Sequence, residues 1–251
     1  MISTYVKLIN NLEKLKLISF KDNLDTILDQ VNNKEINYIE SLLQLTTNEL
    51  KIRNEKARFA CVRTANFPFL KEFDDFDFSF QPSINEDEIR GFSDFRFIEK
   101  QENILLLGTS GVGKSHLATS IGIECAKNRY STYFITCNDL LANLKKAHLE
   151  NRLTARLKHY SKYKVLIIDE IGYLPIDKNS ANMFFQLINM RYEKHSTIIT
   201  TNKSFSKWGE VFGDSTIANA ILDRLLHHSH VIKITGNSYR TKGKIETTRK
   251  E

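Results

Sequence analysis

The stretch ILLLGTSGVGKS, residues 104–115, constrains the fold more than any other part of the sequence. A four-residue apolar run leads into a complete GxxxxGK[ST] pattern, and a helical pattern follows. Glycines let successive backbone amides converge on one point, at the positive end of the helix that begins there. The order strand, glycine-rich turn and helix therefore predicts a phosphate-binding loop. A turn without a ligand is disfavoured, because the pattern is complete in its required context.

Short apolar runs alternate with helical patterns from residue 103 onward. The expected strands cover residues 104–107, 131–136, 165–169, 196–201 and 230–234. The expected helices lie at 114–127, within 138–162, at 178–194 and within 205–226. Apolar strands separated by helices are typical of a parallel sheet that is covered on both faces. The sequence thus predicts an α/β core over residues 103–240, with a five-stranded parallel sheet and helices on both sides.

The front of the chain has a different pattern. Apolar residues at helical spacing predict a small N-terminal helical domain over residues 1–66. Residues 67–102 are rich in phenylalanine and acidic side chains, and no helical or strand period places all the rings on one side. We therefore expect an extended connector that lies across an apolar groove. Residues 241–251 are expected to form a polar tail.

The loop residues have specific expected roles. Lys114 would reach the β- and γ-phosphates of a nucleotide, and Ser115 would offer its hydroxyl to Mg²⁺. The predicted nucleotide-binding residues are Gly108, Thr109, Ser110, Gly111, Val112, Gly113, Lys114, Ser115 and His116. ATP and Mg²⁺ are the expected cofactors.

Two further strands are expected to end in polar residues at the same edge of the sheet. The run VLIID ends in Asp169, which can hold the Mg²⁺ water shell together with Ser115. The neighbouring Glu170 can orient or deprotonate the attacking water. Asn202 ends the strand STIITT, where an amide can bridge the γ-phosphate and that water. The predicted catalytic residues in this part of the chain are Lys114, Asp169, Glu170 and Asn202.

The sequence also raises the possibility of a GTPase. Asn202-Lys203-Ser204-Phe205 begins like the NKxD motif that reads guanine, but the guanine contact needs a carboxylate where this chain has Phe205. Adenine is therefore the better match. The expected strand at 131–136 lies between the loop and the Asp169 strand, which favours ATPases of the AAA+ and RecA kind.

Arg224 stands on a helical segment far along the chain from the loop. It is predicted to reach the γ-phosphate of a neighbouring subunit, and so to act in catalysis across a homo-oligomer. The alternative is a helix-surface ion pair with Asp223. The nearby histidines, His227, His228 and His230, are interpreted as a polar helix end, since no acidic or cysteine partner has suitable spacing in the sequence.

Residues 144–164 carry seven lysines and arginines against one glutamate. Such a strip suits the phosphate backbone of duplex DNA without reading bases, so sequence-independent binding is expected. The candidate DNA-binding residues are Lys145, Lys146, Arg152, Arg156 and Lys158. The alternative is a solvated helix face.

No apolar run approaches the roughly 18 residues that a membrane span needs, and no membrane partner is expected. The cysteines, Cys61, Cys125 and Cys137, show no metal-binding or paired spacing. They are expected to be buried free thiols in a reducing compartment. The sequence therefore predicts a soluble cytoplasmic protein.

Several stretches resemble the IstB/DnaC-like branch of AAA+ ATPases, and within it the IstB transposition helpers: FPFLKEFDDFDFSFQPS, VLIIDEIGYLP, TTNKSFSKWGEVFGD and AILDRLLHHSHVIKITGNSYR. The resemblance assigns Lys114 and Ser115 to Walker A and Asp169 and Glu170 to Walker B. It makes Asn202 the sensor 1 residue, Arg224 the arginine finger and Arg240 a further arginine that faces nucleotide or DNA. It also implies a core without a separate helical lid domain. One departure is Gly-Thr-Ser-Gly where the family usually has two prolines, which removes no catalytic group.

The resemblance implies an ATP-dependent protein that oligomerises on duplex DNA, selects target DNA and stimulates the transposase of the same element. ATP hydrolysis would control assembly. A DnaC-like replicative helicase loader is the alternative, because it would use the same motor residues. A nucleotide-gated scaffold without useful turnover is a third possibility. The sequence leaves open the subunit number, the transposase-contacting surface and whether hydrolysis triggers disassembly or insertion.

Overall fold

The computed structural model describes residues 3–241, and the chain forms two compact units, Met1–Ala60 and Cys61–Glu251. The first unit contains α1 (Thr4–Lys14), α2 (Ile18–Asn32) and most of α3 (Tyr38–Thr64). The polar tail predicted at 241–251 lies outside the described residues except for Thr241.

The first unit has a small apolar core and one buried carboxylate. Leu12, Leu24, Ile27 and Leu45 form the core. The Glu49 carboxylate of α3 accepts hydrogen bonds from the backbone N–H of Phe20, in the first turn of α2, and from Arg53. A negative charge is stabilising at a helix N-terminus, so Glu49 fixes α2 against α3. Within the helical domain predicted over residues 1–66, the chain turns between α1 and α2 at Lys16, whose φ is 56°.

The second unit is built on a five-stranded parallel sheet, which confirms the predicted fold class. Its strands are β1 (Asn103–Gly108), β2 (Thr132–Thr136), β3 (Val165–Ile171), β4 (Ser196–Thr201) and β5 (Ser229–Ile234). They follow the order β2-β3-β4-β1-β5, and every neighbouring pair is parallel. This order brings the carboxyl ends of β1, β3 and β4 side by side, which is where an open parallel sheet binds ligands.

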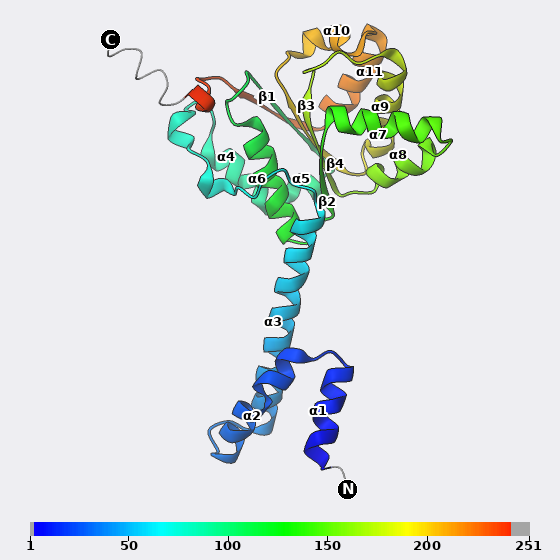
Figure 1. Ribbon diagram of the computed structural model, residues 1–251. Helices are drawn as coiled ribbons and strands as arrows, with labels where there is room; N and C mark the ends of the chain where they lie inside the picture. The colour runs from blue at the N-terminus through cyan, green and yellow to red at the C-terminus, as the bar shows by residue number, and fades with distance from the viewer. Residues whose placement is uncertain (1–2, 242–251) are drawn as a thin grey trace. The chain divides into compact units, whose positions relative to one another are not determined.

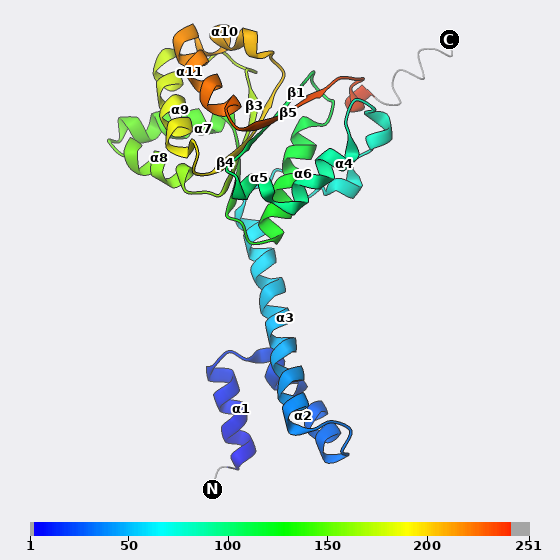
Figure 2. The ribbon, with the colours of Figure 1, turned by 180° about the vertical axis from the view of Figure 1, so that it is seen from behind.

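Neighbouring residues of a strand pack into two separate apolar cores, because successive side chains in a strand point to opposite faces of the sheet. Ile104 and Leu106 of β1 pack in one cluster with residues of α6, while Leu105 packs in the other with residues of α7, α9 and α11. Figures 1 and 2 show the corresponding helices on the two faces of the sheet. The continuous apolar strand runs in the sequence are explained by this double coverage.

The helices of the second unit join and cover these strands. After α3 come η1 (Phe73–Asp75), η2 (Phe78–Phe80), α4 (Glu86–Gly91), η3 (Phe92–Asp94) and α5 (Arg96–Glu99). The remaining elements are α6 (Lys114–Lys127), α7 (Cys137–Leu149), α8 (Leu153–Ser161), α9 (Lys178–Arg191), η4 (Phe205–Lys207), α10 (Trp208–Phe212), α11 (Ser215–Leu226) and η5 (Tyr239–Thr241). The helices α6 and α9 agree with the segments expected at 114–127 and 178–194. The expected segment 138–162 forms α7 and α8, and the expected segment 205–226 forms η4, α10 and α11.

The connector predicted over residues 67–102 is not extended, because it contains the short helical elements η1, η2, α4, η3 and α5. Its phenylalanine-rich part is segment 67–84. It forms the 3₁₀ turns η1 and η2, and Phe73 is buried in the same core cluster as β1 and α6. Phe67, Phe76 and Phe78 pack against that cluster. Short 3₁₀ turns let closely spaced rings point in different directions, so the segment has no simple period. It folds as part of the second unit.

The cysteines match their prediction only in part. Cys125 and Cys137 are buried, whereas Cys61 is half-exposed, and all are free thiols. Burial raises the pKa of both buried thiols, that of Cys137 to about 12. These two side chains are therefore unreactive parts of the core.

Candidate nucleotide-binding site

The loop between β1 and α6 has a shape that only glycine allows at two positions. Gly111 and Gly113 have φ values of 82° and 98°, in the left-handed region. A Cβ atom on Gly113 would lie 2.4 Å from the Cε2 atom of Phe76, and one on Gly111 would lie 2.0 Å from the Oγ atom of Ser238. The loop therefore needs glycine both for its backbone and for the close approach of neighbouring segments.

A cavity of about 500 Å³ opens in front of this loop. Its volume falls within the range of roughly 300–1,000 Å³ that is usual for small-molecule sites. The lining includes residues 110–116 from the loop and α6, Glu170, Thr200 and Asn202 from the strand ends, and side chains from segments 69–81 and 239–240. Gly108 and Thr109 belong to the loop but lie behind this lining: a Cβ atom on Gly108 would lie 2.4 Å from the carbonyl oxygen of Ile234. The glycine cradle and the cavity fit a nucleotide whose phosphates face the loop.

Lys114 extends back along the loop. Its Nζ atom donates a 2.7 Å hydrogen bond to the carbonyl oxygen of Thr109. Burial lowers the pKa of Lys114, and the nearby charge of Arg240 adds to this effect, while Asp169 and Glu170 oppose it. A partly desolvated ammonium gains from an anionic partner, so the position favours phosphate binding.

The carboxylate of Asp169 is buried and held by two hydroxyl groups. Ser115 Oγ donates to Asp169 Oδ1 at 2.9 Å, and Thr200 Oγ1 donates to the same oxygen. This group of oxygens is the kind of donor set that Mg²⁺ prefers. Ser115 and Asp169 are thus brought together as the sequence predicted, and they fit the metal of a nucleotide complex.

Glu170 and Asn202 line the cavity from the ends of two adjacent strands. Glu170 has a φ of 63°, and its backbone N–H donates a 2.9 Å hydrogen bond to Thr200 Oγ1. Asn202 follows β4 directly. The structure therefore places the predicted pair next to Lys114 and Ser115 in one cavity.

His116 contacts the wall of the cavity formed by the phenylalanine-rich segment. Its ring meets the rings of Phe69 and Phe76 edge to face, with centroids 6.1 and 5.2 Å apart, and its Nε2 atom lies 3.2 Å from the Glu72 carbonyl oxygen. Burial lowers the pKa of His116. This aromatic packing holds His116 on the wall of the cavity, where it can contact a bound nucleotide.

Arg224 lies on α11 and outside the described residues that line the cavity. Its Nε atom donates to Asn189 Oδ1 at 2.8 Å, and its guanidinium carbon lies 4.7 Å from the centroid of the Phe185 ring. The helix-surface alternative paired Arg224 with Asp223, but these contacts hold the guanidinium against α9 instead. Arg224 is thus separate from the site of its own chain, as a residue acting on a neighbour would be.

The candidate DNA-binding residues do not form one continuous strip. Lys146, Arg152 and Arg156 line a cleft of about 270 Å³ between α7 and α8. Lys145 instead forms a 2.7 Å ion pair with Asp177, at the N-terminus of α9. Lys158 is exposed on α8, outside the described lining of the cleft. Three of the five predicted residues are therefore grouped.

Several residues of the site escaped prediction. Thr200 contacts both Asp169 and the backbone of Glu170, and the two threonines that end STIITT were its only signal in the sequence. Gln81 donates a 2.9 Å hydrogen bond to the Asn237 carbonyl oxygen, and the Tyr239 N–H donates to the Gly111 carbonyl oxygen at 2.9 Å. These bonds fasten segments from before and after the core strands onto the phosphate loop.

The guanine-reading alternative is not supported by the position of Phe205. Its ring packs against Trp208, with centroids 5.8 Å apart, and belongs to the apolar cluster under α10. The NKxD-like sequence therefore makes a core contact at the position where a guanine reader would need a carboxylate.

The parallel sheet order, the glycine loop and the acidic end of β3 define a P-loop ATPase of the AAA+ class. Solved structures support this fold: AMPPCP-bound DnaA from Aquifex aeolicus matches with a TM-score of 0.56 and 18% identity, over 71% of this chain and 55% of that one. A crystal structure of the DnaC helicase loader matches with a TM-score of 0.50 and 25% identity, over 69% of this chain and 98% of that one.

The chain belongs to the family of IstB-like ATP binding proteins, whose model matches residues 10–247. A protein of insertion sequence IS232 from Bacillus thuringiensis subsp. berliner, named as an ATP-binding protein, is 57% identical over 96% of both chains. Its counterpart in insertion sequence IS21 from Pseudomonas aeruginosa is 43% identical, over 93% of this chain and 88% of that one. The chain is therefore an ATP-binding ATPase of this family, which confirms the resemblance inferred from its motifs.

Replacing Thr200 with valine is expected to lower ATP turnover about 10- to 100-fold while changing ATP affinity little. The variant keeps the side-chain shape but removes a buried hydroxyl from Asp169 and Glu170, a loss of about 1–3 kcal/mol. Steady-state hydrolysis and nucleotide titration measure the two effects separately. Thr200→Ser restores the hydroxyl and is the matched control. Wild-type turnover in Thr200→Val would show that this contact does not position the acidic residues.

Proposed function

We propose that the chain is an ATP-dependent DNA-binding helper of transposition, which oligomerises on duplex DNA, selects target DNA and stimulates the transposase of its own element. The observation that carries the proposal is the near full-length similarity to insertion-sequence ATP-binding proteins, together with the glycine-loop cavity that fits a nucleotide. Among residues 3–241, no helix is long and apolar enough to cross a membrane.

The hydrolytic step follows from the positions of the side chains. Lys114 binds the β- and γ-phosphates, and Asn202 holds the attacking water near the terminal phosphate. Glu170 accepts a proton from that water. When bound, Mg²⁺ neutralises charge on the phosphate oxygens. Ser115 and Asp169 would hold it, and Thr200 keeps the Asp169 carboxylate in place.

Arg224 links this chemistry to oligomerisation. Because it is held on α9 and α11 away from its own cavity, it acts on the γ-phosphate of the adjacent subunit. The ATP site is then complete only between two copies, which makes assembly depend on the triphosphate. Hydrolysis removes the group that Arg224 binds and so weakens the contact between subunits.

The cleft between α7 and α8 supplies the DNA contact. Lys146 and Arg156 of its lining neutralise backbone phosphates and release counterions, so binding depends on salt and little on base sequence, whereas Arg152 already pairs with Glu150. Lys145 contributes less, because its ammonium already pairs with Asp177.

Removing two cleft cations together, Lys146→Ala and Arg156→Ala, is expected to lower the slope of log affinity against log salt by about 1.8. Fluorescence anisotropy on a labelled duplex, with a slowly hydrolysed ATP analogue present, measures this slope. Lys145→Ala is the control, and its slope should stay near that of the wild type. An unchanged slope in the double variant would place the DNA elsewhere on the protein.

A replicative helicase loader is the second candidate function, favoured by the match to the DnaC helicase loader over 98% of that chain. The residues of the ATP site do not distinguish the two functions, because both functions need the same ATP site. Two reconstituted assays can: strand transfer by a transposase of the same element, and loading of a replicative helicase. The proposal expects stimulation of strand transfer and no loading, and the reverse result would favour the loader.

A further inference from the structure

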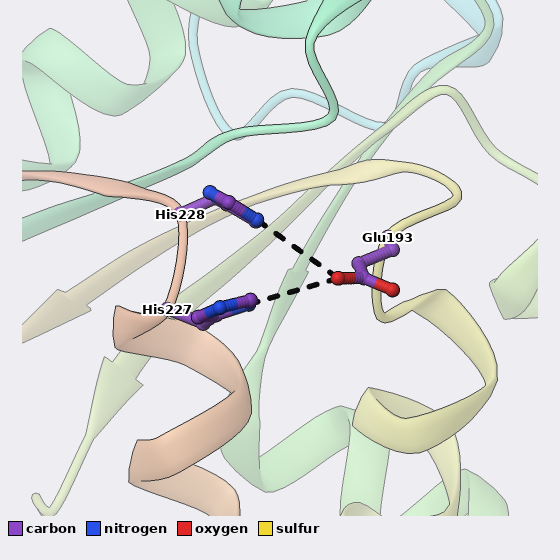
Figure 3. Close-up of side chains that lie close together, drawn as sticks. All are labelled: Glu193, His227 and His228. Atoms are coloured by element: carbon purple, nitrogen blue, oxygen red, sulfur yellow. Dashed lines mark ion pairs between the residues drawn. The ribbon is translucent and has the colours of Figure 1, made fainter.

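Two histidines and a glutamate meet on the surface of the ATPase unit, away from the nucleotide cavity. His227 and His228 directly follow α11, and Glu193 lies two residues beyond the end of α9 (Figure 3). The Glu193 Oε1 atom lies 3.7 Å from His227 Nδ1 and 3.9 Å from His228 Nε2. Spacing along the sequence does not reveal this group, because Glu193 is distant from the histidines along the chain.

The spacing of these atoms is close to what a small metal ion needs. The three ligand atoms all lie within 4.8 Å of one another. Bonds of about 2.0–2.1 Å to a tetrahedral zinc ion would place them about 3.3 Å apart. All three side chains are about half exposed, so they can rotate through this difference without moving the backbone.

The donor set also selects the kind of metal. Imidazole nitrogen suits zinc and the neighbouring transition metals, whereas Mg²⁺ and Ca²⁺ prefer oxygen. The two imidazole rings lie only 4.0 Å apart between centroids, so protonating both would place two like charges side by side. A metal ion binds both rings in their neutral form and adds the carboxylate as a third ligand, which leaves room for water at the fourth position.

We propose that Glu193, His227 and His228 form a binding site for a divalent transition-metal ion of the zinc type. The ion joins the end of α9 to the end of α11, because its ligands come from both. The Tyr192 hydroxyl, 2.8 Å from His227 Nδ1, is an adjacent polar group that gives up this contact when the nitrogen takes the metal.

The site has a direct structural connection to Arg224. This arginine bonds to Asn189 of α9, stands on α11, and has its guanidinium carbon 6.0 Å from the centroid of the Tyr192 ring. A metal that fixes the ends of α9 and α11 therefore fixes the two helices that hold Arg224. We therefore expect metal binding to change the rate of ATP hydrolysis. That expectation rests on the proposed role of Arg224, whereas metal binding itself does not.

The test titrates Co²⁺ into the full chain, prepared without a histidine tag and without nucleotide, and follows visible absorption; Zn²⁺ is then added in competition. The proposal expects one Co²⁺ per chain with the spectrum of a low-coordinate nitrogen and oxygen site, and displacement by Zn²⁺. The variants Glu193→Gln and His228→Ala should each weaken binding at least about 10-fold. His148→Ala removes an exposed histidine of α7 and should bind like the parent.

Two results would overturn the site. One is the absence of a Co²⁺ spectrum in the parent chain, and the other is Co²⁺ affinity equal to that of the parent in the Glu193→Gln and His228→Ala variants. Circular dichroism on each variant checks that it is folded, and Glu193→Gln is expected to fold like the parent because the side chain is exposed. ATP hydrolysis measured with and without Zn²⁺ gives a separate result. Metal binding without any change in hydrolysis would keep the site and count only against its coupling to Arg224.

Discussion

Replacing Lys114 with alanine is expected to weaken ATP binding about 100-fold and to reduce hydrolysis to background. The ammonium is partly desolvated in the cavity, where a charge-assisted bond to phosphate contributes about 3 kcal/mol. Equilibrium titration with a fluorescent ATP analogue measures the affinity, and phosphate release measures the turnover.

The matched control for this variant is Lys207→Ala, which removes an exposed lysine of η4 outside the cavity. It should bind and hydrolyse ATP like the parent. If Lys114→Ala bound ATP with parental affinity, the loop between β1 and α6 would not be the phosphate site.

Replacing Arg224 with alanine is expected to reduce ATP hydrolysis by about 10³-fold or more, the range found when an arginine finger is removed. ATP binding by the isolated chain should change little, because Arg224 is outside the described lining of its own cavity. Glu170→Gln should also bind ATP and fail to hydrolyse it, since the amide cannot take the proton from water. On the proposed mechanism, the two variants lack different parts of one composite site.

Mixing these two variants separates a finger that acts on a neighbour from one that acts within its own chain. In a mixed assembly, an Arg224→Ala subunit has an intact Glu170 and can receive the arginine of a Glu170→Gln neighbour. An equal mixture should recover about a quarter of parental turnover if neighbours join at random through head-to-tail contacts. A mixture as inactive as its components would show that Arg224 does not work across the interface.

The sheet was predictable because its information is local. β1 and β3 contain continuous runs of apolar residues, and GTSGVGKS fixes both the end of β1 and the start of α6. The alternation between two cores, as at Leu105 and Leu106, explains why these runs lack polar residues. The conjunction of Lys114, Ser115 and Asp169 followed from the rule that parallel strands end at one edge of the sheet.

The rest depends on contacts between distant parts of the chain, which spacing does not reveal. The segment 67–84 resembled a connector because its phenylalanine rings follow neither a helical nor a strand period. Phe76 nevertheless lines the cavity and lies close to Gly113. Glu193 reaches two histidines from another helix, so the sequence offered no reason to group them. The domain boundaries and the roles of Asn202, Arg224 and the cleft cations stay predictions.

The central claim is that a triphosphate in the glycine loop of one subunit joins it to the next along duplex DNA. Analytical ultracentrifugation of the parent chain and of Lys114→Ala, each with duplex DNA and a slowly hydrolysed ATP analogue, tests it most directly. The account predicts large protein–DNA assemblies for the parent, none without the analogue, and none for Lys114→Ala. Assemblies of equal size formed by Lys114→Ala, or by the parent without nucleotide, would contradict it.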